Sequence, residues 1–342
     1  MRRIVGKDKK GRTVLINVPS YDDMYINNQF GPQIALAFSS NGSGSASTPA
    51  AASGQKAIFG YGFTSVVVSM TNLVSNTGVV ATDTTGVGTA RRRLAAAGYG
   101  TDKAIFGYGF SSTDVSITNL VSNTGVVATD TTGVGTARYN LAAAGYGTDK
   151  AIFGFGVDIN VIPYSITNLV SNTGVVATNT TGVGTVKYYL AAAGYGTDKA
   201  IFGYGINGLT SADSSTTNKV SNTGVVATDT TGIGTARVAL AAAGYGTDKA
   251  IFGYGYSFPL GYSLSITNLV SNTGVVATDT TGVGTARNEL AAAAYGTDKA
   301  IFGYGSNLSI TNLVSNTGIV ATDTTGVGTG RYGLAAAGYG TP

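Results

Sequence analysis

Apolar and polar positions alternate in short runs that recur six times between Gln55 and the end of the chain. One repeat contains four such runs, bounded by glycines or short polar turns: Leu94–Gly100, Lys103–Gly109, Ser116–Ser122 and Val126–Thr131. Alternation with a period of two between turn residues predicts β-strands. The Leu-Ala-Ala-Ala that opens the first run would also suit a helix. However, the run is short and Gly-Tyr-Gly follows at once, which favours a strand.

The turns between these runs predict antiparallel hairpins. The Asn-Thr-Gly at 123–125 suits a three-residue hairpin whose glycine takes a positive φ, and polar residues 101–102 join the first two runs. In the second run we expect Ile105 on one face and Phe106 with Tyr108 on the other. Both faces of the sheet would then be apolar, as in a sheet packed between two others.

The repeat length indicates the architecture. The phrase KAIFGYG begins at 56, 103, 199, 249 and 299, and KAIFGFG at 150, so that successive starts lie 47, 47, 49, 50 and 50 residues apart. Such a period is typical of repeat folds. Four antiparallel strands per repeat describe a β-propeller blade. The Ala- and Gly-rich first runs suit strands that converge on an axis, where only small side chains leave room.

The order of runs at the two ends predicts a closed ring. The first repeat starts at a second run, Lys56, and the last repeat ends after a first run, Leu334–Gly340. No distinct capping repeats, which a solenoid needs, are present. We therefore expect an all-β, six-bladed β-propeller of four-stranded antiparallel blades, closed by pairing of the C-terminal strand with the N-terminal half-blade.

The expected domain organisation has three parts. Residues 1–38 form an extended N-terminal anchoring arm, in which TVLINVPSYDDMYI (13–26) contains a plausible strand. Residues 39–54 are a Gly/Ser/Ala-rich linker, and residues 55–342 form the propeller.

Composition excludes several kinds of chemistry. The chain has no cysteine and no histidine, so it lacks thiolate ligands, the commonest metal ligand and the commonest general base. We expect no cofactor and no metal. The net charge is +4, and residues 1–54 contribute +3 of it, so the repeats lack the basic stripe of a nucleic-acid surface. No apolar run approaches the ~18 residues of a membrane span, and the basic start lacks the apolar core of a secretory signal.

The stretch ARRRLAAAGYGTDKAIFGYG, Ala90–Gly109, resembles the core of a kelch repeat. In that family an arginine precedes a strand of small residues, a short turn follows, and an aromatic-aliphatic strand ends in glycines. The resemblance extends over all six repeats and implies a kelch-like propeller.

The copies differ in two windows per repeat. The first window lies between the second and third runs: 63–70, 110–117, 157–166, 206–216, 256–266 and 306–310. The second is the pair of residues after the repeated Arg or Lys. Blade geometry places both windows at one end of the propeller, around the mouth of the central channel, where variable loops on a rigid scaffold can form a recognition surface. The alternative is that exposed loops drift because nothing constrains them.

The candidate ligand-binding residues follow from these windows. The pairs contribute Arg92, Arg93, Tyr139, Asn140, Tyr188, Tyr189, Asn288, Glu289 and Tyr332. The loops contribute Phe63, Asp114, Tyr164, Asp213, Tyr256, Tyr262 and Asn307. Tyr, Asn and Arg are residue types favoured in adaptable binding sites.

Three recurring polar residues have competing interpretations. The Asp of ATDTTG either accepts hydrogen bonds within its own turn, which we favour, or ligates a cation. The position is occupied by Asp83, Asp130, Asp229, Asp279 and Asp323, and by Asn179 in the remaining repeat. The Asp of GTDK is expected in a hairpin turn. The repeated Arg or Lys either binds an anion at the channel or, as we favour, bonds carbonyl groups between blades; it is Arg91, Arg138, Lys187, Arg237, Arg287 and Arg331.

These features favour a non-enzymatic protein. Kelch-type copper oxidases need Cys and His, and the aromatic Asp-box pattern of sialidase-like propellers is missing, although Tyr, Arg and Glu289 occur in the variable windows. We expect a phage virion appendage (tail fibre, spike or decoration protein) at the particle surface. It would bind a host-surface glycan or protein, contact other virion proteins through its arm, and form a homo-oligomer.

Two alternatives remain. One is a protein-interaction propeller in the cytoplasm or at a bacterial cell surface, and the other is a filament-forming repeat protein. A glycan binder should cluster Tyr and Asn in pockets at the channel mouth, whereas a protein binder should present a broader apolar patch.

Overall fold

The computed structural model describes residues 2–7, 13–18 and 56–340, and none of these residues is helical. Accordingly, the described part of the chain contains no helix with the length and hydropathy of a membrane span. The chain divides into two units, Met1–Ala46 and Ser47–Pro342. All structure described below, apart from one hairpin, belongs to the second unit.

The first unit contains an antiparallel hairpin. Strand β1 (Arg2–Lys7) pairs with β2 (Thr13–Val18), with Arg2 opposite Val18 and Lys7 opposite Thr13. Strand β2 is the strand expected in this segment, whereas β1 is an addition to the predicted extended arm. The predicted linker, residues 39–54, lies outside the described residues.

The second unit contains small antiparallel sheets of three strands that repeat one plan. In each sheet an AAAGY-type first strand pairs with a KAIFG second strand, which pairs with a third strand. The six sheets are β25 (Ala335–Tyr339), β3 (Lys56–Phe63) and β4 (Val67–Val74); β5 (Ala95–Tyr99), β6 (Lys103–Gly107) and β7 (Thr118–Val121); β8 (Ala142–Tyr146), β9 (Lys150–Gly154) and β10 (Thr167–Val170); β12 (Ala191–Tyr195), β13 (Lys199–Gly203) and β16 (Thr217–Val220); β17 (Ala241–Tyr245), β18 (Lys249–Gly253) and β21 (Thr267–Val270); and β22 (Ala291–Tyr295), β23 (Lys299–Gly303) and β24 (Thr311–Val314).

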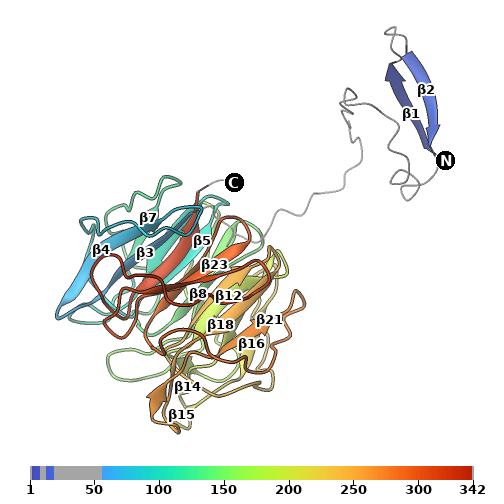
Figure 1. Cartoon of the computed structure of the whole chain (residues 1–342). Helices are drawn as coiled ribbons and strands as arrows, with labels where there is room; N and C mark the ends of the chain where they lie inside the picture. Colours follow the sequence, from blue (N-terminus) through green and yellow to red (C-terminus); the bar gives the residue numbers. More distant parts are fainter. Residues whose placement is uncertain (1, 8–12, 19–55, 341–342) are drawn as a thin grey trace. The chain divides into compact units, whose positions relative to one another are not determined.

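The sheet that joins both ends of the repeat region has the same register as the others. Strand β25 pairs with β3, with Ala335 opposite Gly60 and Tyr339 opposite Lys56, although these strands lie at opposite ends of the repeats. The first strands also contact one another in sequence: β5 contacts β8, then β12, β17, β22 and β25 follow, and β25 contacts β5 (Figure 1). Ala and Gly of these six strands line a narrow space of about 40 Å³ between them.

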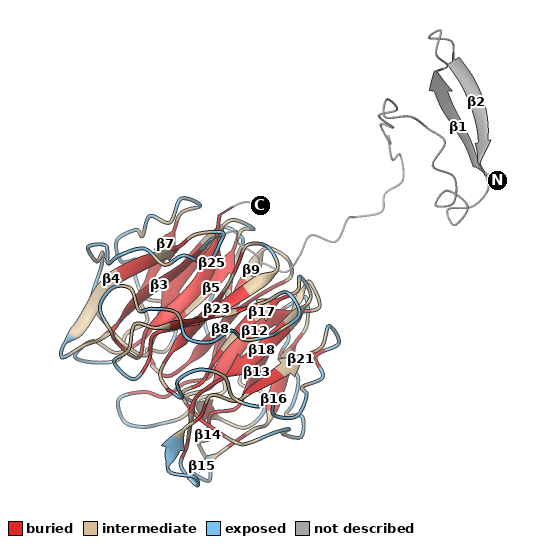
Figure 2. Cartoon of the chain, viewed as in Figure 1, coloured by how far each residue is buried: buried red, intermediate tan, exposed pale blue. Residues whose placement is uncertain are grey.

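Apolar cores lie between adjacent sheets, and the first and second strands of the sheets are mostly buried while the connecting loops are intermediate or exposed (Figure 2). Ile105 packs toward one neighbouring sheet, and Phe106 packs toward the other against the ring of Tyr61. The expectation that Tyr108 shares the face of Phe106 is wrong, because Tyr108 lies in the cluster of Ile105. The backbone of Tyr108 has a φ of 62°, which ends the alternation of the strand.

The expectation of a regular fourth strand in each sheet is also wrong. In the sheet of β5, the fourth run bonds β7 only through isolated bridges, Val121 to Val127 and Thr118 to Thr131. Between these bridges, three residues of the outer run (128–130) lie opposite two residues of β7 (119–120), which is the geometry of a bulge. The Asn119 side chain donates to the Ala128 carbonyl within this bulge. The sheets are therefore three-stranded, with a bulged outer segment.

Candidate functional site

The two variable windows of each repeat are joined by backbone hydrogen bonds at one end of each sheet. Six contacts of this kind connect a residue of the pair to the first residue of a loop: Tyr332 to Phe63, Arg92 to Phe110, Tyr139 to Val157, Tyr188 to Ile206, Val238 to Tyr256, and Asn288 to Ser306. The fourth contact belongs to a small sheet of β11 (Lys187–Tyr188), β14 (Ile206–Asn207) and β15 (Ala212–Asp213). The fifth adjoins the hairpin of β19 (Tyr256–Ser257) and β20 (Tyr262–Ser263). We call this end, formed by the two windows, the variable end.

The second residues of the six pairs form a closed cycle of backbone hydrogen bonds. Each amide N–H donates to the carbonyl of the preceding member, in the order Arg93, Asn140, Tyr189, Ala239, Glu289, Gly333 and back to Arg93. All six residues have a positive φ, from 49° at Glu289 to 62° at Gly333. The cycle fixes the six backbone positions while their side chains differ completely.

The turns that are nearly the same in every repeat gather at the opposite end, which we call the constant end. The N–H of Gly100 donates to the Asp149 carbonyl of the next sheet, and Gly340 donates to Asp102 in the same way. Gly100 also lies against the carbonyl of Asn172 in an Asn-Thr-Gly turn. The predicted positive φ of these turns is confirmed at Gly125, with 86°.

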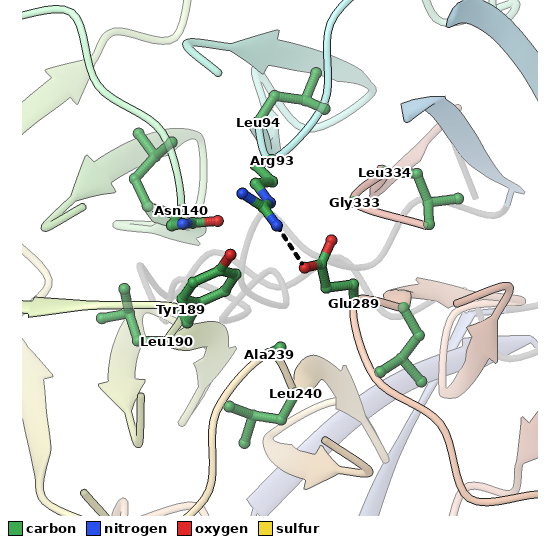
Figure 3. Close-up of a pocket in the computed structure, with 12 residues that line it drawn as sticks. Arg93, Leu94, Asn140, Tyr189, Leu190, Ala239, Leu240, Glu289, Gly333 and Leu334 are labelled. Carbon is green, nitrogen blue, oxygen red and sulfur yellow. Dashed lines mark hydrogen bonds and ion pairs between the residues drawn. The ribbon is translucent and has the colours of Figure 1, made fainter. Parts of the chain in front are cut away.

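A pocket of about 80 Å³ lies inside the cycle at the variable end (Figure 3). It is lined by the second residues of the pairs and by the leucines that follow them. The Arg93 and Glu289 side chains point toward each other there, with Nη2 and Oε1 3.0 Å apart. The Arg93 guanidinium also lies 5.2 Å from the centre of the Tyr189 ring. The predicted residues Arg93, Asn140, Tyr189 and Glu289 are therefore brought together.

Burial and charge set the protonation of this group. Burial raises the pKa of Tyr189 to about 12, although the positive charge of Arg93 opposes this. Burial alone would lower the pKa of Arg93, but the Glu289 carboxylate together with Tyr189 and Tyr139 outweighs it and raises that pKa. Two atoms of the pair, Arg93 Nε and Glu289 Oε2, are buried without a hydrogen-bond partner among the described residues. Such groups cost about 1–3 kcal/mol each unless a partner is supplied.

An aromatic arc on the rim consists of Tyr332, Arg92 and Tyr139, which are first residues of three pairs, and the loop residues Phe63 and Phe110. The rings of Phe63 and Tyr332 are 5.4 Å apart, as are those of Phe110 and Tyr139. The Arg92 guanidinium lies between them, 4.5 Å from the ring centre of Phe63 and 5.9 Å from that of Phe110. Tyr188 lies 5.9 Å from Tyr189 and Asn288 donates to Ser263 Oγ, so neither belongs to this arc.

The acidic loop residues tie neighbouring loops together. Asp114 accepts a hydrogen bond from the N–H of Ile159, and Asp213 accepts one from the N–H of Phe258 in the next loop.

The other predicted loop residues do not join loops. Tyr164 donates to Asp158 within its own loop, so that it fixes the loop shape. Tyr256 packs against Phe258, whereas Tyr262 and Asn307 are exposed. The loop residues therefore surround the central pocket but do not line it.

Exposed apolar residues gather at the tips of three successive loops, and of these the sequence predicted only Tyr262. The others are Ile159, Val161, Ile162, Leu209, Phe258 and Leu260, of which Leu209 is the most exposed at 77%. The hydrogen bond from Phe258 to Asp213 ties two of these loops together. The signal in the sequence was the apolar phrases VIP and FPL inside otherwise polar windows.

The repeated arginine is structural, as expected. Arg91 is fully buried and donates to the Tyr108 carbonyl, the Thr89 carbonyl and Asn119 Oδ1. Its guanidinium also lies 4.3 Å from the centre of the Tyr61 ring in the adjacent sheet. It therefore joins two sheets and does not face a channel.

The expectation that the Asp of ATDTTG bonds its own turn is wrong. Asp130 accepts hydrogen bonds from the N–H and hydroxyl of Thr89, which lies 41 residues earlier in the chain, and from Asn119. The bulge in the outer segment directs this carboxylate toward the Arg91 side chain, 3.9 Å away. Asp83 makes the same bonds to Thr329, across the two ends of the repeat region.

Within residues 56–340 and the two N-terminal strands, no group of three or more acidic, His or Cys side chains is placed to hold a metal ion. Neither protein-family models nor curated proteins match the chain. The resemblance to kelch repeats therefore stays a prediction.

Proposed function

We propose that the six sheets are the blades of one closed β-propeller and that the protein is a recognition module whose variable end binds a host-surface glycan or protein. The pairing of β25 with β3 and the closed cycle of backbone hydrogen bonds support the closed ring. The blades would each carry three strands and a bulged outer segment.

The observation that carries the binding proposal is the backbone pairing of the two variable windows. Residues that differ between repeats contact one another at one end, while the repeated turns lie at the other. The hydrogen-bond cycle also holds Arg93, Ala239 and Gly333 in one backbone conformation, so that side chains can change without altering the scaffold. Variable side chains on such a fixed frame are how recognition surfaces are generally built.

The proposal extends to a virion appendage by analogy with repeat proteins that vary at one face. The arm that contains β1 and β2 would contact other virion proteins, and the particle would carry several copies. We propose binding without catalysis, because Glu289, the lone glutamate of the chain, is engaged by Arg93.

A cell-binding assay tests this function. The labelled full chain is incubated with a panel of bacterial strains and compared with a variant in which the nine predicted pair residues become alanine. Alanine suits the second position of each pair because Ala239 already holds the same φ, and Gly333, which is not one of the nine, stays unchanged. We expect the variant to keep its melting temperature and lose binding. Equal binding by both proteins would reject the variable end as the site.

A protein partner is favoured by one specific observation, the exposed apolar tips of the three successive loops. Exposed apolar patches of this kind mark protein-binding surfaces. Replacing Leu209, Phe258 and Leu260 by serine would then abolish cell binding, whereas a glycan held at the channel mouth would still bind.

A further inference from the structure

The central pocket has a balanced charge. Its lining contains one cation, Arg93, and one anion, Glu289, which are paired, together with the polar side chains of Asn140 and Tyr189. The pocket remains accessible, since the Arg93 and Glu289 side chains keep 24% and 15% of their exposure. An anion brought here would meet the carboxylate, and a cation would meet the guanidinium, so each faces a repulsion as well as an attraction.

The polar groups of the pocket offer both donors and acceptors. Arg93 can only donate and Glu289 can only accept, while the Tyr189 hydroxyl and the Asn140 amide can do both. A hydroxyl group also donates and accepts, so one ligand hydroxyl can bond Arg93 and Glu289 at once. Arg93 Nε and Glu289 Oε2 still lack partners among the described residues, so the pair retains unused hydrogen-bonding capacity.

The size and walls of the pocket limit what enters it. A volume of about 80 Å³ holds roughly two or three water molecules, which matches one edge of a sugar ring and excludes a whole disaccharide. Leu94 and its five counterparts supply apolar contact beside the polar groups. This combination of apolar walls and a few placed polar groups is typical of small-ligand sites.

We propose that the central pocket binds the uncharged, hydroxyl-bearing terminal sugar of a glycan, and that the Arg93–Glu289 pair makes the site select neutral over anionic termini. This inference rests on the proposed function, since the rest of the glycan would lie on the variable end. The aromatic arc offers ring faces beside the pocket for the next sugars.

An array of paired oligosaccharides tests this selectivity. Each pair is printed with its terminal sugar free and with that sugar capped by sialic acid. The full chain should bind the free member at least about tenfold more tightly, the effect of one charge-assisted hydrogen bond. Glu289→Gln leaves a net positive pocket of the same shape, so this preference should fall about tenfold. The double variant Arg93→Gln/Glu289→Gln removes the pair, so it should bind both members more weakly and with a smaller preference than the unchanged chain.

A matched control lies at the constant end, where Val225→Ser changes an exposed side chain and should leave both affinities unchanged. Melting temperatures establish that each variant is folded. If Glu289→Gln leaves the preference unchanged, or if capped glycans bind as well as free ones, the inference is overturned while the proposed function stands on the cell assay. Cell binding without any glycan binding would likewise overturn the inference alone. Binding to neither cells nor glycans would overturn both.

Discussion

At the scale of residues, one small set of side-chain contacts joins neighbouring sheets. Two repeats carry a substitution within this set. The set joins a buried arginine, an asparagine and an aspartate with a threonine 41 residues earlier. Asn179 replaces the aspartate, so that the fully buried Arg138 lacks the nearby carboxylate that Arg91 has. Lys187 replaces the arginine and bonds Asn218 and Asp229. A buried cation without a paired anion is costly.

The variant Asn179→Asp should therefore stabilise the protein by about 1 kcal/mol, because it restores a charge-assisted contact to Arg138 and Thr136. Its matched opposite, Asp130→Asn, should destabilise by a similar amount. Urea unfolding of both variants measures the change. Loss of stability in Asn179→Asp would mean that the carboxylate is not what supports these joints.

The aspartates of this set should make stability depend on acid. Burial alone would raise the pKa of Asp229, but hydrogen bonds from Thr185 and Asn218 and the charge of Lys187 outweigh it and lower the pKa to about 2. A carboxyl with a depressed folded pKa stabilises the protein above its unfolded pKa of about 3.9, and this is lost as pH falls toward the folded value. The pKa values of Asp83, Asp130, Asp279 and Asp323 are lowered in the same direction.

We therefore expect the melting temperature to fall between about pH 4 and pH 2. In Asp229→Asn one of the titrating groups is missing, so the fall should be smaller, from a lower starting value. Thermal melts of both proteins across this range measure the difference. Parallel curves would show that Asp229 does not contribute to the acid sensitivity.

At the scale of elements, the sheets interlock through a glycine and an aromatic ring. A Cβ added at Gly107 would lie 2.7 Å from Cζ of Phe153 in the next sheet, and a Cβ at Gly60 would meet Phe106 in the same way. The close approach lets the Phe153 ring reach Tyr108, with ring centres 5.1 Å apart. The second strands therefore need glycine at this position because of their neighbours.

The variant Gly107→Ala should cost about 1–3 kcal/mol, the usual cost of overpacking a buried site. Adding Phe153→Leu removes the clashing ring atom, so the double variant should lose less than the sum of the two single variants. Denaturant midpoints of the three variants give the coupling. Additive losses would mean that the strain in Gly107→Ala does not come from its contact with Phe153.

The elements that were predictable share a local cause. The first, second and third strands and the Asn-Thr-Gly turn follow from alternation and turn residues that lie close in sequence. The role of Asp130 was missed because its hydrogen-bond partner, Thr89, lies in another repeat. The face of Tyr108 was missed because a positive φ at a tyrosine leaves no signal in a period-two pattern.

At the scale of the whole molecule, repetition and variation are separated in space. Sequence alone indicated which windows vary and that they share one end. The hydrogen-bond cycle through Arg93 and Gly333 could not be foreseen, because it depends on positive φ values at residues as different as arginine and glutamate. The central ion pair was missed for a related reason, since Arg93 and Glu289 lie 196 residues apart.

Masking one end at a time tests the central claim, that binding occurs at the variable end, most directly. The chain has no cysteine, so a single introduced thiol can carry a bulky polymer. Ser112→Cys places it on an exposed loop of the variable end, and Asn123→Cys places it on an exposed turn of the constant end in the same repeat. Binding of the coupled proteins to the bacterial panel is then compared. We predict that the polymer at 112 abolishes binding and the polymer at 123 leaves it intact; the reverse result, or equal loss from both positions, would contradict the account.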